Sequence, residues 1–323
     1  MRLAFILNLI ILQFFLSSEA LSNESVNVYR EADGAIVLTG ENCDFIKRHT
    51  SALSNWKTNL KEVPKKISSN CSCDSFRCYM NINEVIPEFV EHYQDVNAGR
   101  WGPNCWNTVL VVSQILPVTR FSPPEEMNFW MSSPLCKEVQ ENDVPQPGDI
   151  AAVRGRNQDE VHASIYITDE LFFSKNAVMT SASYRLQSSI GIFSIFPVQF
   201  SCRHRSGNPS DCTTYVNYFR CTSFADYAKN QNIILTNRYK ELEALVLKQE
   251  QMVSKVIFEW KTNPDLQHAS PEILRDIQLK MNSIHDEVTG RANDITASPD
   301  QHLIWNGLKF RIIGILLSID WIS

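Results

Sequence analysis

Hydrophobic residues recur with two different periods along the chain, and these periods predict the kinds of elements present. The run 34–40 has the β-branched content of a short strand, and the spacing within 45–63 predicts a helix. From about residue 100 to 200, one helical stretch precedes several runs rich in β-branched and aromatic residues, separated by polar or glycine-containing turns. These runs predict the strands of an antiparallel sheet: 149–154, 162–168, 170–175 and 191–198.

After about residue 222 the pattern becomes helical. Apolar residues recur at alternating steps of three and four from Leu242 to Trp260 and again from Leu274 to Val288. Ser270-Pro271 and Ser298-Pro299 each place a capping hydroxyl before a proline, so they predict the starts of the later helices. We expect a C-terminal helical hairpin. The apolar run 310–322 is too short to span a bilayer and is expected to dock on the core.

The first twenty residues predict a cleavable signal peptide, because a basic start, an apolar stretch and a small-x-small site follow one another. We therefore expect a secreted or periplasmic protein without stable membrane insertion. The net charge of −6 and the lack of an extended basic patch argue against a nucleic-acid partner.

Nine cysteines in an exported chain predict four disulfides and one unpaired thiol. The cluster in 71–78, "CSCDSFRC", resembles a metal knuckle, but it lacks a second Cys/His pair at finger spacing. Disulfides are the preferred interpretation, and neither a metal nor an organic cofactor is expected.

One cysteine lies at a predicted helix start, in the sequence "GPNCWNTVLVVSQIL". Asn104 is a good N-cap, which puts Cys105 at the first helical position, where the helix dipole and free backbone amides favour a thiolate. The Cys105 amide also suits an oxyanion formed by attack on a carbonyl. These features favour a nucleophile, although Cys105 could instead form half of a disulfide and leave another cysteine unpaired.

A thiolate nucleophile works with an imidazole that the fold brings close to it. Among the seven histidines, His162 has the most suggestive setting, because it opens the predicted strand "HASIYIT". Lying on the face opposite Ile165 and Ile167, it is expected to project toward the N-terminus of a helix packed on the sheet. The sequence therefore predicts a Cys105–His162 pair.

The order of these motifs resembles the NlpC-type papain-like cell-wall endopeptidases. In that family a Cys begins a helix, a Pro-Gly-Asp turn opens a strand and a His begins another strand; here the counterparts are Cys105, 147–149 and His162. The family's polar third residue falls on Ser174, with Asn176 as the alternative. The sequence departs from the pattern at Asn104-Cys105-Trp106-Asn107, where the family commonly has Asp-Cys-Ser-Gly.

The resemblance, which covers about residues 98 to 177, implies an α+β fold with the cysteine-bearing helix packed on an antiparallel sheet. We expect four parts: a signal peptide (1–20), an N-terminal disulfide-containing region (21–98), a papain-like catalytic domain (99–222) and a C-terminal helical region (223–323). The expected activity is that of an exported cysteine peptidase or amidase acting on a peptide or peptidoglycan substrate. An inactive binding protein that uses its C-terminal helices, and an acyltransferase or protease with the same dyad, stay open as alternatives.

Overall fold

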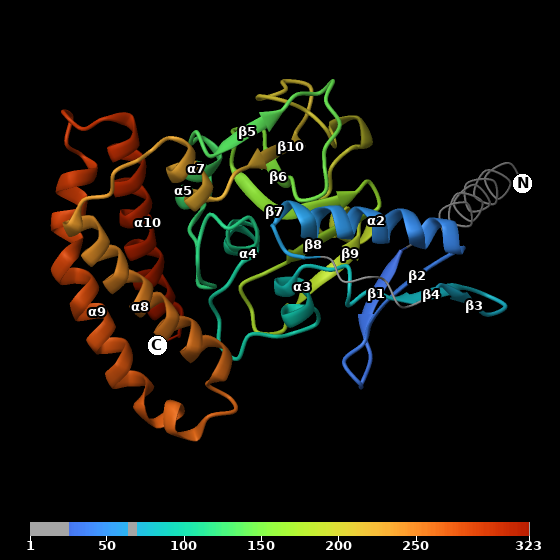
Figure 1. The fold of residues 1–323 in the computed structure, drawn as a ribbon, viewed down its shortest axis with the longest axis horizontal. Coiled ribbons are helices and arrows are strands. Elements are labelled where there is room, and N and C mark those ends of the chain that lie inside the picture. The colour runs from blue at the N-terminus through green and yellow to red at the C-terminus, as the bar shows by residue number, and fades with distance from the viewer. Residues whose placement is uncertain (1–25, 64–69, 323) are drawn as a thin grey trace, which may run out of the picture.

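A computed structural model describes residues 26–63 and 70–322, so the predicted signal peptide lies outside the described residues. The described chain combines helices with two antiparallel sheets, which confirms the mixed helix-and-sheet class. In Figure 1 a larger sheet occupies the middle of the molecule, a smaller sheet lies on one side of it and long C-terminal helices lie on the other.

The larger sheet has six antiparallel strands and supports the predicted site. Their spatial order is β5 (Cys136–Val139), β10 (Thr214–Cys221), β6 (Ile150–Gly155), β7 (Glu160–Thr168), β8 (Leu171–Lys175) and β9 (Tyr184–Ser188). The strands predicted near 149–154, 162–168 and 170–175 are thus confirmed. The strand predicted for 191–198 is wrong: α6 (Ser189–Ile195) is a helix there, capped by the Ser188 hydroxyl, which accepts a bond from the Gly191 amide at 3.1 Å.

Helices cover the two faces of this sheet unequally. One face packs its alternate residues Ala163, Ile165 and Ile167 in the same apolar core as α2 (Cys43–Asn59), α4 (Cys105–Val112) and α5 (Pro124–Met131). The other face, with Tyr166 and Phe172, packs against α6 and the 3-10 helix η1 (Phe200–Cys202). The helix that begins with Cys105 therefore lies on an antiparallel sheet, as predicted.

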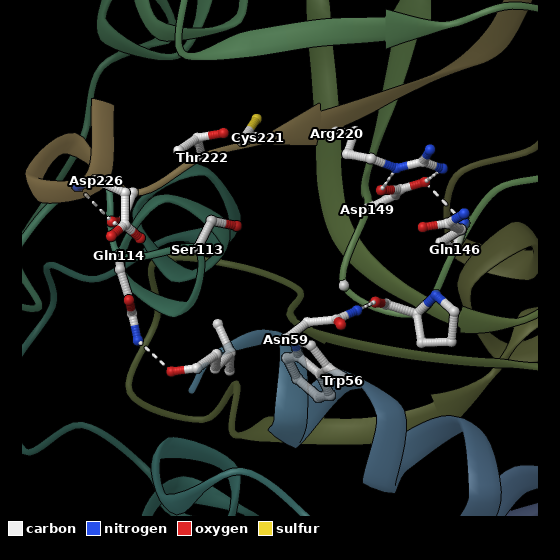
Figure 2. Close-up of a pocket in the computed structure, with 14 residues that line it drawn as sticks. Trp56, Asn59, Ser113, Gln114, Gln146, Asp149, Arg220, Cys221, Thr222 and Asp226 are labelled. Carbon is white, nitrogen blue, oxygen red and sulfur yellow. Dashed lines mark hydrogen bonds and ion pairs between the residues drawn. The ribbon is translucent and has the colours of Figure 1, made fainter. Parts of the chain in front are cut away.

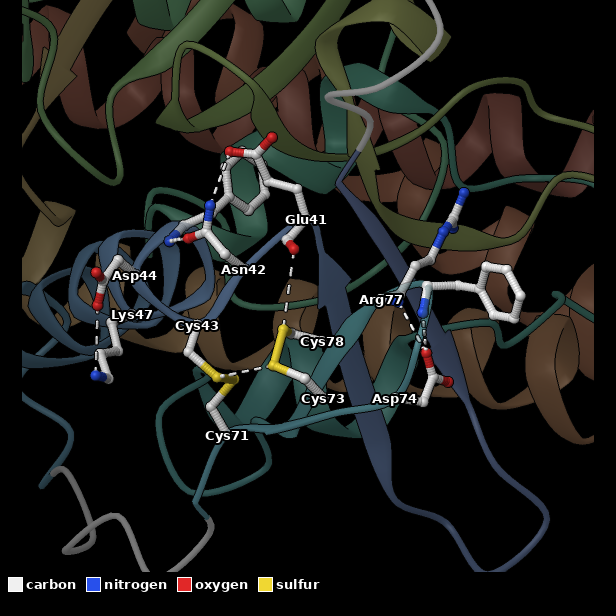
Figure 3. The surroundings of a disulfide bond; sticks show 12 residues. Glu41, Asn42, Cys43, Asp44, Lys47, Cys71, Cys73, Asp74, Arg77 and Cys78 are labelled. Atoms are coloured by element: carbon white, nitrogen blue, oxygen red, sulfur yellow. Dashed lines mark hydrogen bonds and ion pairs between the residues drawn. A yellow bond between two sulfur atoms is a disulfide. The ribbon is translucent and has the colours of Figure 1, made fainter.

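The N-terminal region forms the smaller sheet, which one disulfide, Cys43–Cys71, links to α2. Its strands are, in spatial order, β1 (Asn27–Arg30), β2 (Ile36–Gly40), β4 (Cys78–Asn81) and β3 (Ser72–Cys73), and α3 (Glu88–Tyr93) follows in the chain. Figure 3 shows the disulfides Cys43–Cys71 and Cys73–Cys78 side by side, with all four sulfurs within 4.8 Å of one another. The knuckle-like cluster is therefore joined as two disulfides.

The C-terminal region has an apolar core of its own, built from three long helices rather than a two-helix hairpin. After the short α7 (Phe224–Asn230) come α8 (Asn237–Glu259), α9 (Pro264–Ala292) and α10 (Pro299–Ile322). The heptad positions from Leu242 to Val256 and from Leu274 to Val288 are buried between these helices. The apolar periodicity thus predicted the packed faces correctly.

The start predicted for α9 at Pro271 is wrong, because the helix begins seven residues earlier, at Pro264. Asn263 caps it by accepting a hydrogen bond from the Leu266 amide at 3.2 Å. Pro271 therefore lies inside the helix and cannot donate to the carbonyl of Gln267. The Ser270 hydroxyl donates to that carbonyl instead, at 3.2 Å, so the helix continues through the proline.

The predicted start of α10 at Ser298-Pro299 agrees with the structure. The Ser298 hydroxyl accepts from the Gln301 amide at 3.3 Å, and the Gln301 side chain accepts from the Ser298 amide at 3.1 Å, which is a capping box. Within the described residues, α10 is long and apolar enough to cross a membrane. Its apolar residues, including Ile312, Ile315 and Ile319, are nevertheless buried against α8 and α9, as expected for docking on the core.

Candidate functional site

Cys105 is the unpaired cysteine. All nine cysteines lie within the described residues, and the other eight form four disulfides, which indicates an oxidising extracellular environment. Asn104 is the N-cap of α4, and its side chain accepts a hydrogen bond from the Asn107 amide at 3.0 Å. The thiol therefore lies at the first helical position, as the sequence predicted.

Burial dominates the electrostatics of this thiol. Cys105 is 7% exposed, and this desolvation raises its pKa to about 11. The backbone N–H groups of Ala163, of Trp106 and of Cys105 itself favour the thiolate and partly offset that rise in pKa. In this conformation the thiol is protonated at neutral pH, although three amides are in place to stabilise an anion.

Lys175, a residue that the sequence reasoning missed, lies on the same face of the sheet as the thiol. It is fully buried at the end of β8, two residues from Phe173, which packs in the core that α4 shares. Its ammonium donates to the carbonyls of Ala177 and Met179, and burial lowers its pKa to about 8. A Cys105 thiolate would raise that pKa again, so the two groups lie within electrostatic reach of each other.

The segment that leads into Cys105 is packed against the helical region. The Arg100 amide donates to the carbonyl of Ile257 at 2.9 Å, and a Cβ added to Gly102 would lie 2.9 Å from the Ile257 side chain. On the other side, the Gly102 amide donates to the carbonyl of Val178 at 3.4 Å. The C-terminal end of α8 thus holds the turn before the thiol in place.

The predicted Cys105–His162 pair is not formed. His162 pairs across the sheet with Val153, and both lie on the face opposite Ala163 and Ile165, against which α4 packs. Its ring is fully buried and stacks on Phe196 with 4.0 Å between centroids, and neither ring nitrogen has a hydrogen-bond partner. Burial lowers the pKa of His162 to about 3. The expectation failed because α4 covers the face that carries the isoleucines.

Ser174 and Asn176, predicted to orient the imidazole, lie on the same side of the sheet as His162. The Ser174 hydroxyl donates to Asn176 Oδ1 at 2.9 Å, and the amide of Gln187 on β9 donates to both residues, at 2.7 and 2.8 Å. These bonds form a closed polar cluster that includes neither His162 nor Cys105. Three of the four predicted site residues therefore share one face, and the nucleophile candidate lies on the other.

The Pro-Gly-Asp motif lies at the opposite end of α4 from the thiol. The motif lines a pocket of about 330 Å³, in which Asn59 donates to the carbonyl of Pro147. Arg220 forms an ion pair with Asp149 there at 2.8 Å, and both side chains can be followed in Figure 2. The Trp56 ring packs against Gly148, whose φ of +101° favours glycine. The motif thus builds a turn against α2 and lies away from the nucleophile candidate.

A buried polar network ties the start of α4 to the loop that follows this helix. The Asn104 side-chain amide donates to the carbonyl of Ser122 at 2.7 Å, and the Asn107 side-chain oxygen accepts from the Arg120 amide at 3.0 Å. These bonds fix the orientation of the helix end that carries Cys105.

The same loop carries a buried charge cluster that reaches the C-terminal helices. The Arg120 guanidinium is fully buried and bonds Glu126 on α5 at 2.7 Å and Glu250 on α8 at 3.0 Å. Glu250 also bonds Arg311 on α10 at 2.7 Å, and Arg311 reaches the partly exposed Glu243 at 3.4 Å, so two cations meet three carboxylates. Burial alone would lower the pKa of Arg120, but the carboxylates outweigh it and the net effect raises that pKa. Sequence reasoning could not find this cluster, because Arg120 and Glu250 are 130 residues apart.

Comparisons of the chain with family models, with curated proteins and with solved structures found no match.

Proposed function

We propose that the protein is an exported cysteine hydrolase of amide bonds, with a papain-like catalytic region in which Cys105 is the nucleophile and Lys175 is the base. The observation that carries the proposal is the position of the unpaired thiol. Eight cysteines form disulfides, and the ninth lies at a helix start, where three backbone amides favour its thiolate and a buried lysine lies within electrostatic reach.

Lys175 supports the proposal better than His162 for geometric and electrostatic reasons. It shares the thiol's face of the sheet, whereas the His162 ring stacks on Phe196 on the opposite face. With pKa values of about 11 for Cys105 and about 8 for Lys175, proton transfer from the thiol to the neutral amine costs about 4 kcal/mol. That cost is small compared with the barriers that enzymes overcome.

The mechanism follows from these assignments. Neutral Lys175 accepts the thiol proton, and the Cys105 sulfur attacks the carbonyl carbon of the amide while the Cys105 backbone N–H donates to the oxyanion. The carbon–nitrogen bond then breaks, and the Lys175 ammonium returns the proton to the leaving amine. Water hydrolyses the thioester, releases the carboxylic acid and restores the thiol. Because the thiol is buried, substrate entry requires a local rearrangement around Cys105.

The substrate class is a further part of the proposal. The resemblance to the NlpC-type endopeptidases favours peptidoglycan stem peptides, so a labelled stem peptide is the first substrate to test. Hydrolysis should rise with pH through about 8, as Lys175 loses its proton, whereas an unperturbed imidazole base would give a rise near 6.5.

Three variants of the mature, oxidised protein test the assignments. Cys105→Ala and Lys175→Met should each abolish hydrolysis. Lys57→Met is the matched control, because Lys57 is another buried lysine that donates to a carbonyl, that of Ile86 at 2.8 Å, and it belongs to α2. Full activity in Cys105→Ala would contradict the function. Loss of activity in His162→Phe, with Lys175→Met still active, would contradict the choice of base.

The burial of the thiol favours a second candidate, a binding protein of the same fold without catalysis. In that case Cys105 would stay unreactive in the native state. Iodoacetamide labelling of the native protein, followed by peptide mapping, separates the two candidates. Labelling of Cys105 in the native protein that stem peptide slows by competition supports the hydrolase, and labelling only after denaturation supports the binding protein.

A further inference from the structure

A second pocket, on the sheet face opposite Cys105, has the features of a ligand site. This cavity of about 330 Å³ is lined by residues of β8, α6, η1 and β10 together with the loop after β7. Phe172, Phe193 and Tyr218 contribute aromatic walls, and Phe200, at 85% exposure, stands at its edge. Its volume lies in the range of small-molecule sites.

A cation inside this pocket lacks a carboxylate partner. Within the described part of the chain, the Arg203 guanidinium forms no ion pair, and its Nε is buried without a hydrogen-bond acceptor. Its charge lies over the ring of Phe193 at 4.3 Å and near that of Phe200 at 5.6 Å. Nε2 of the adjacent His204 is likewise buried without a partner. Two buried nitrogens that lack partners point to a missing acceptor.

The pocket also contains an acidic group that does not neutralise this cation. Asp169 accepts a hydrogen bond from the Tyr166 hydroxyl at 3.1 Å and forms no ion pair with Arg203. Both charges nevertheless act on the Tyr218 hydroxyl: burial and Asp169 raise its pKa, and Arg203 lowers it. A carboxylate and a guanidinium therefore line one aromatic pocket without pairing with each other.

We propose that this pocket binds a free, zwitterionic α-amino acid with an apolar or aromatic side chain. The ligand carboxylate bonds Arg203 and His204, its ammonium group bonds Asp169, and its side chain packs between the aromatic walls. A simple anion would meet the uncompensated Asp169, and a simple cation would meet Arg203. Only a ligand that carries both charges satisfies both groups.

The pocket's cationic edge is held rigidly, which favours binding. Arg203 and His204 follow Cys202 directly, and the Cys202–Cys212 disulfide closes the loop that carries them. The Arg205 amide also donates to the carbonyl of Val216 at 3.0 Å, which fixes the loop on β10. A preformed site loses less conformational freedom when a ligand binds.

Calorimetric titration of the mature, oxidised protein tests the proposal with four probes. L-phenylalanine and L-leucine should bind, whereas N-acetyl-L-phenylalanine and L-phenylalanine amide, which each lack one charge, should bind at least about tenfold more weakly. Arg203→Gln and Asp169→Asn should each weaken L-phenylalanine binding to the same degree.

Arg205→Gln is the matched control, because Arg205 lies in the same loop but pairs with Asp211 at 2.9 Å and does not line the pocket. It should bind L-phenylalanine as the unaltered protein does, and thermal melting checks that each variant is folded. Absence of saturable binding by either amino acid would overturn the proposal. Equal binding of the N-acetyl or amide derivative, or equal weakening by Arg205→Gln, would also overturn it. The pocket lies away from Cys105, so these outcomes are independent of the proposed hydrolase activity.

Discussion

Replacement of His162 by phenylalanine tests directly where this imidazole lies. The ring is fully buried, stacks on Phe196 and has two nitrogens without hydrogen-bond partners. A phenyl ring of similar shape would keep the stacking and remove two unsatisfied polar atoms. We therefore expect His162→Phe to be at least as stable as the unaltered protein at pH 7.

The larger effect appears at acid pH. The pKa of His162 is lowered from an ordinary value of 6.5 to about 3, so between these values the unfolded chain binds a proton that the folded chain does not. The contribution of His162 to the free energy of unfolding is therefore fully present above pH 6.5 and is lost as the pH falls. Between pH 7 and pH 4 the loss from this residue is about 3 kcal/mol.

Urea unfolding, followed by circular dichroism at pH 7 and pH 4, measures this difference. The free energy of unfolding of His162→Phe minus that of the unaltered protein should be about 3 kcal/mol larger at pH 4 than at pH 7. A stability difference that does not change with pH would show that the imidazole is solvated or partnered, and the reasoning from burial would fail.

Two further predictions concern the contact between the sheet region and the C-terminal helices. Glu250→Gln removes a buried carboxylate that binds two arginines, so thermal melting should show a loss of about 3–5 kcal/mol. Glu243→Gln, on the same helix but 37% exposed, should lose less than about 1 kcal/mol, and equal losses would refute the argument. Gly314→Ala places a Cβ 2.0 Å from the Arg120 guanidinium and should destabilise the protein. Gly290→Ala, with open space around it in α9, should be neutral or stabilising by up to about 1 kcal/mol. A lower melting temperature for Gly290→Ala than for Gly314→Ala would contradict this account.

Local signals in the sequence were sufficient to predict the helix that carries the thiol. Asn104 provides a cap and the following apolar residues provide a buried face, so the start of α4 and the position of Cys105 could be predicted within a few residues. The odd number of cysteines predicted one unpaired thiol, and this setting favoured Cys105 but left open that it was half of a disulfide. The cap and the apolar face of α4 both depend on interactions between neighbours in the chain.

The position of His162 could not be predicted in the same way. Strand alternation shows that His162 and Ile165 point to opposite faces, but it does not show which face receives α4. The face that receives α4 depends on how α2, α4 and α5 pack together, and these helices pack against the more apolar face. Lys175 was missed for the related reason that a lysine inside a predicted strand is ordinarily solvent-exposed.

The wrong elements have physical causes too. The run 191–198 has the composition of a strand, but Ser188 caps a helix just before it. Two pairs, Asn263-Pro264 and Ser270-Pro271, have the sequence of a capped helix start, and α9 begins at the earlier one. The helix can continue through Pro271 because the Ser270 hydroxyl donates to the carbonyl that Pro271 cannot reach.

The packing of α8 over the turn before Cys105 has a consequence for biosynthesis. All nine cysteines precede α8 in the chain, so during export they become available for oxidation before Ile257 can cover Gly102. Until then the Cys105 thiol competes in disulfide exchange with the eight cysteines that must find their partners. Docking of the last helices therefore fixes the turn that leads into the odd thiol, and a chain that is truncated before α8 should accumulate mispaired disulfides that involve Cys105.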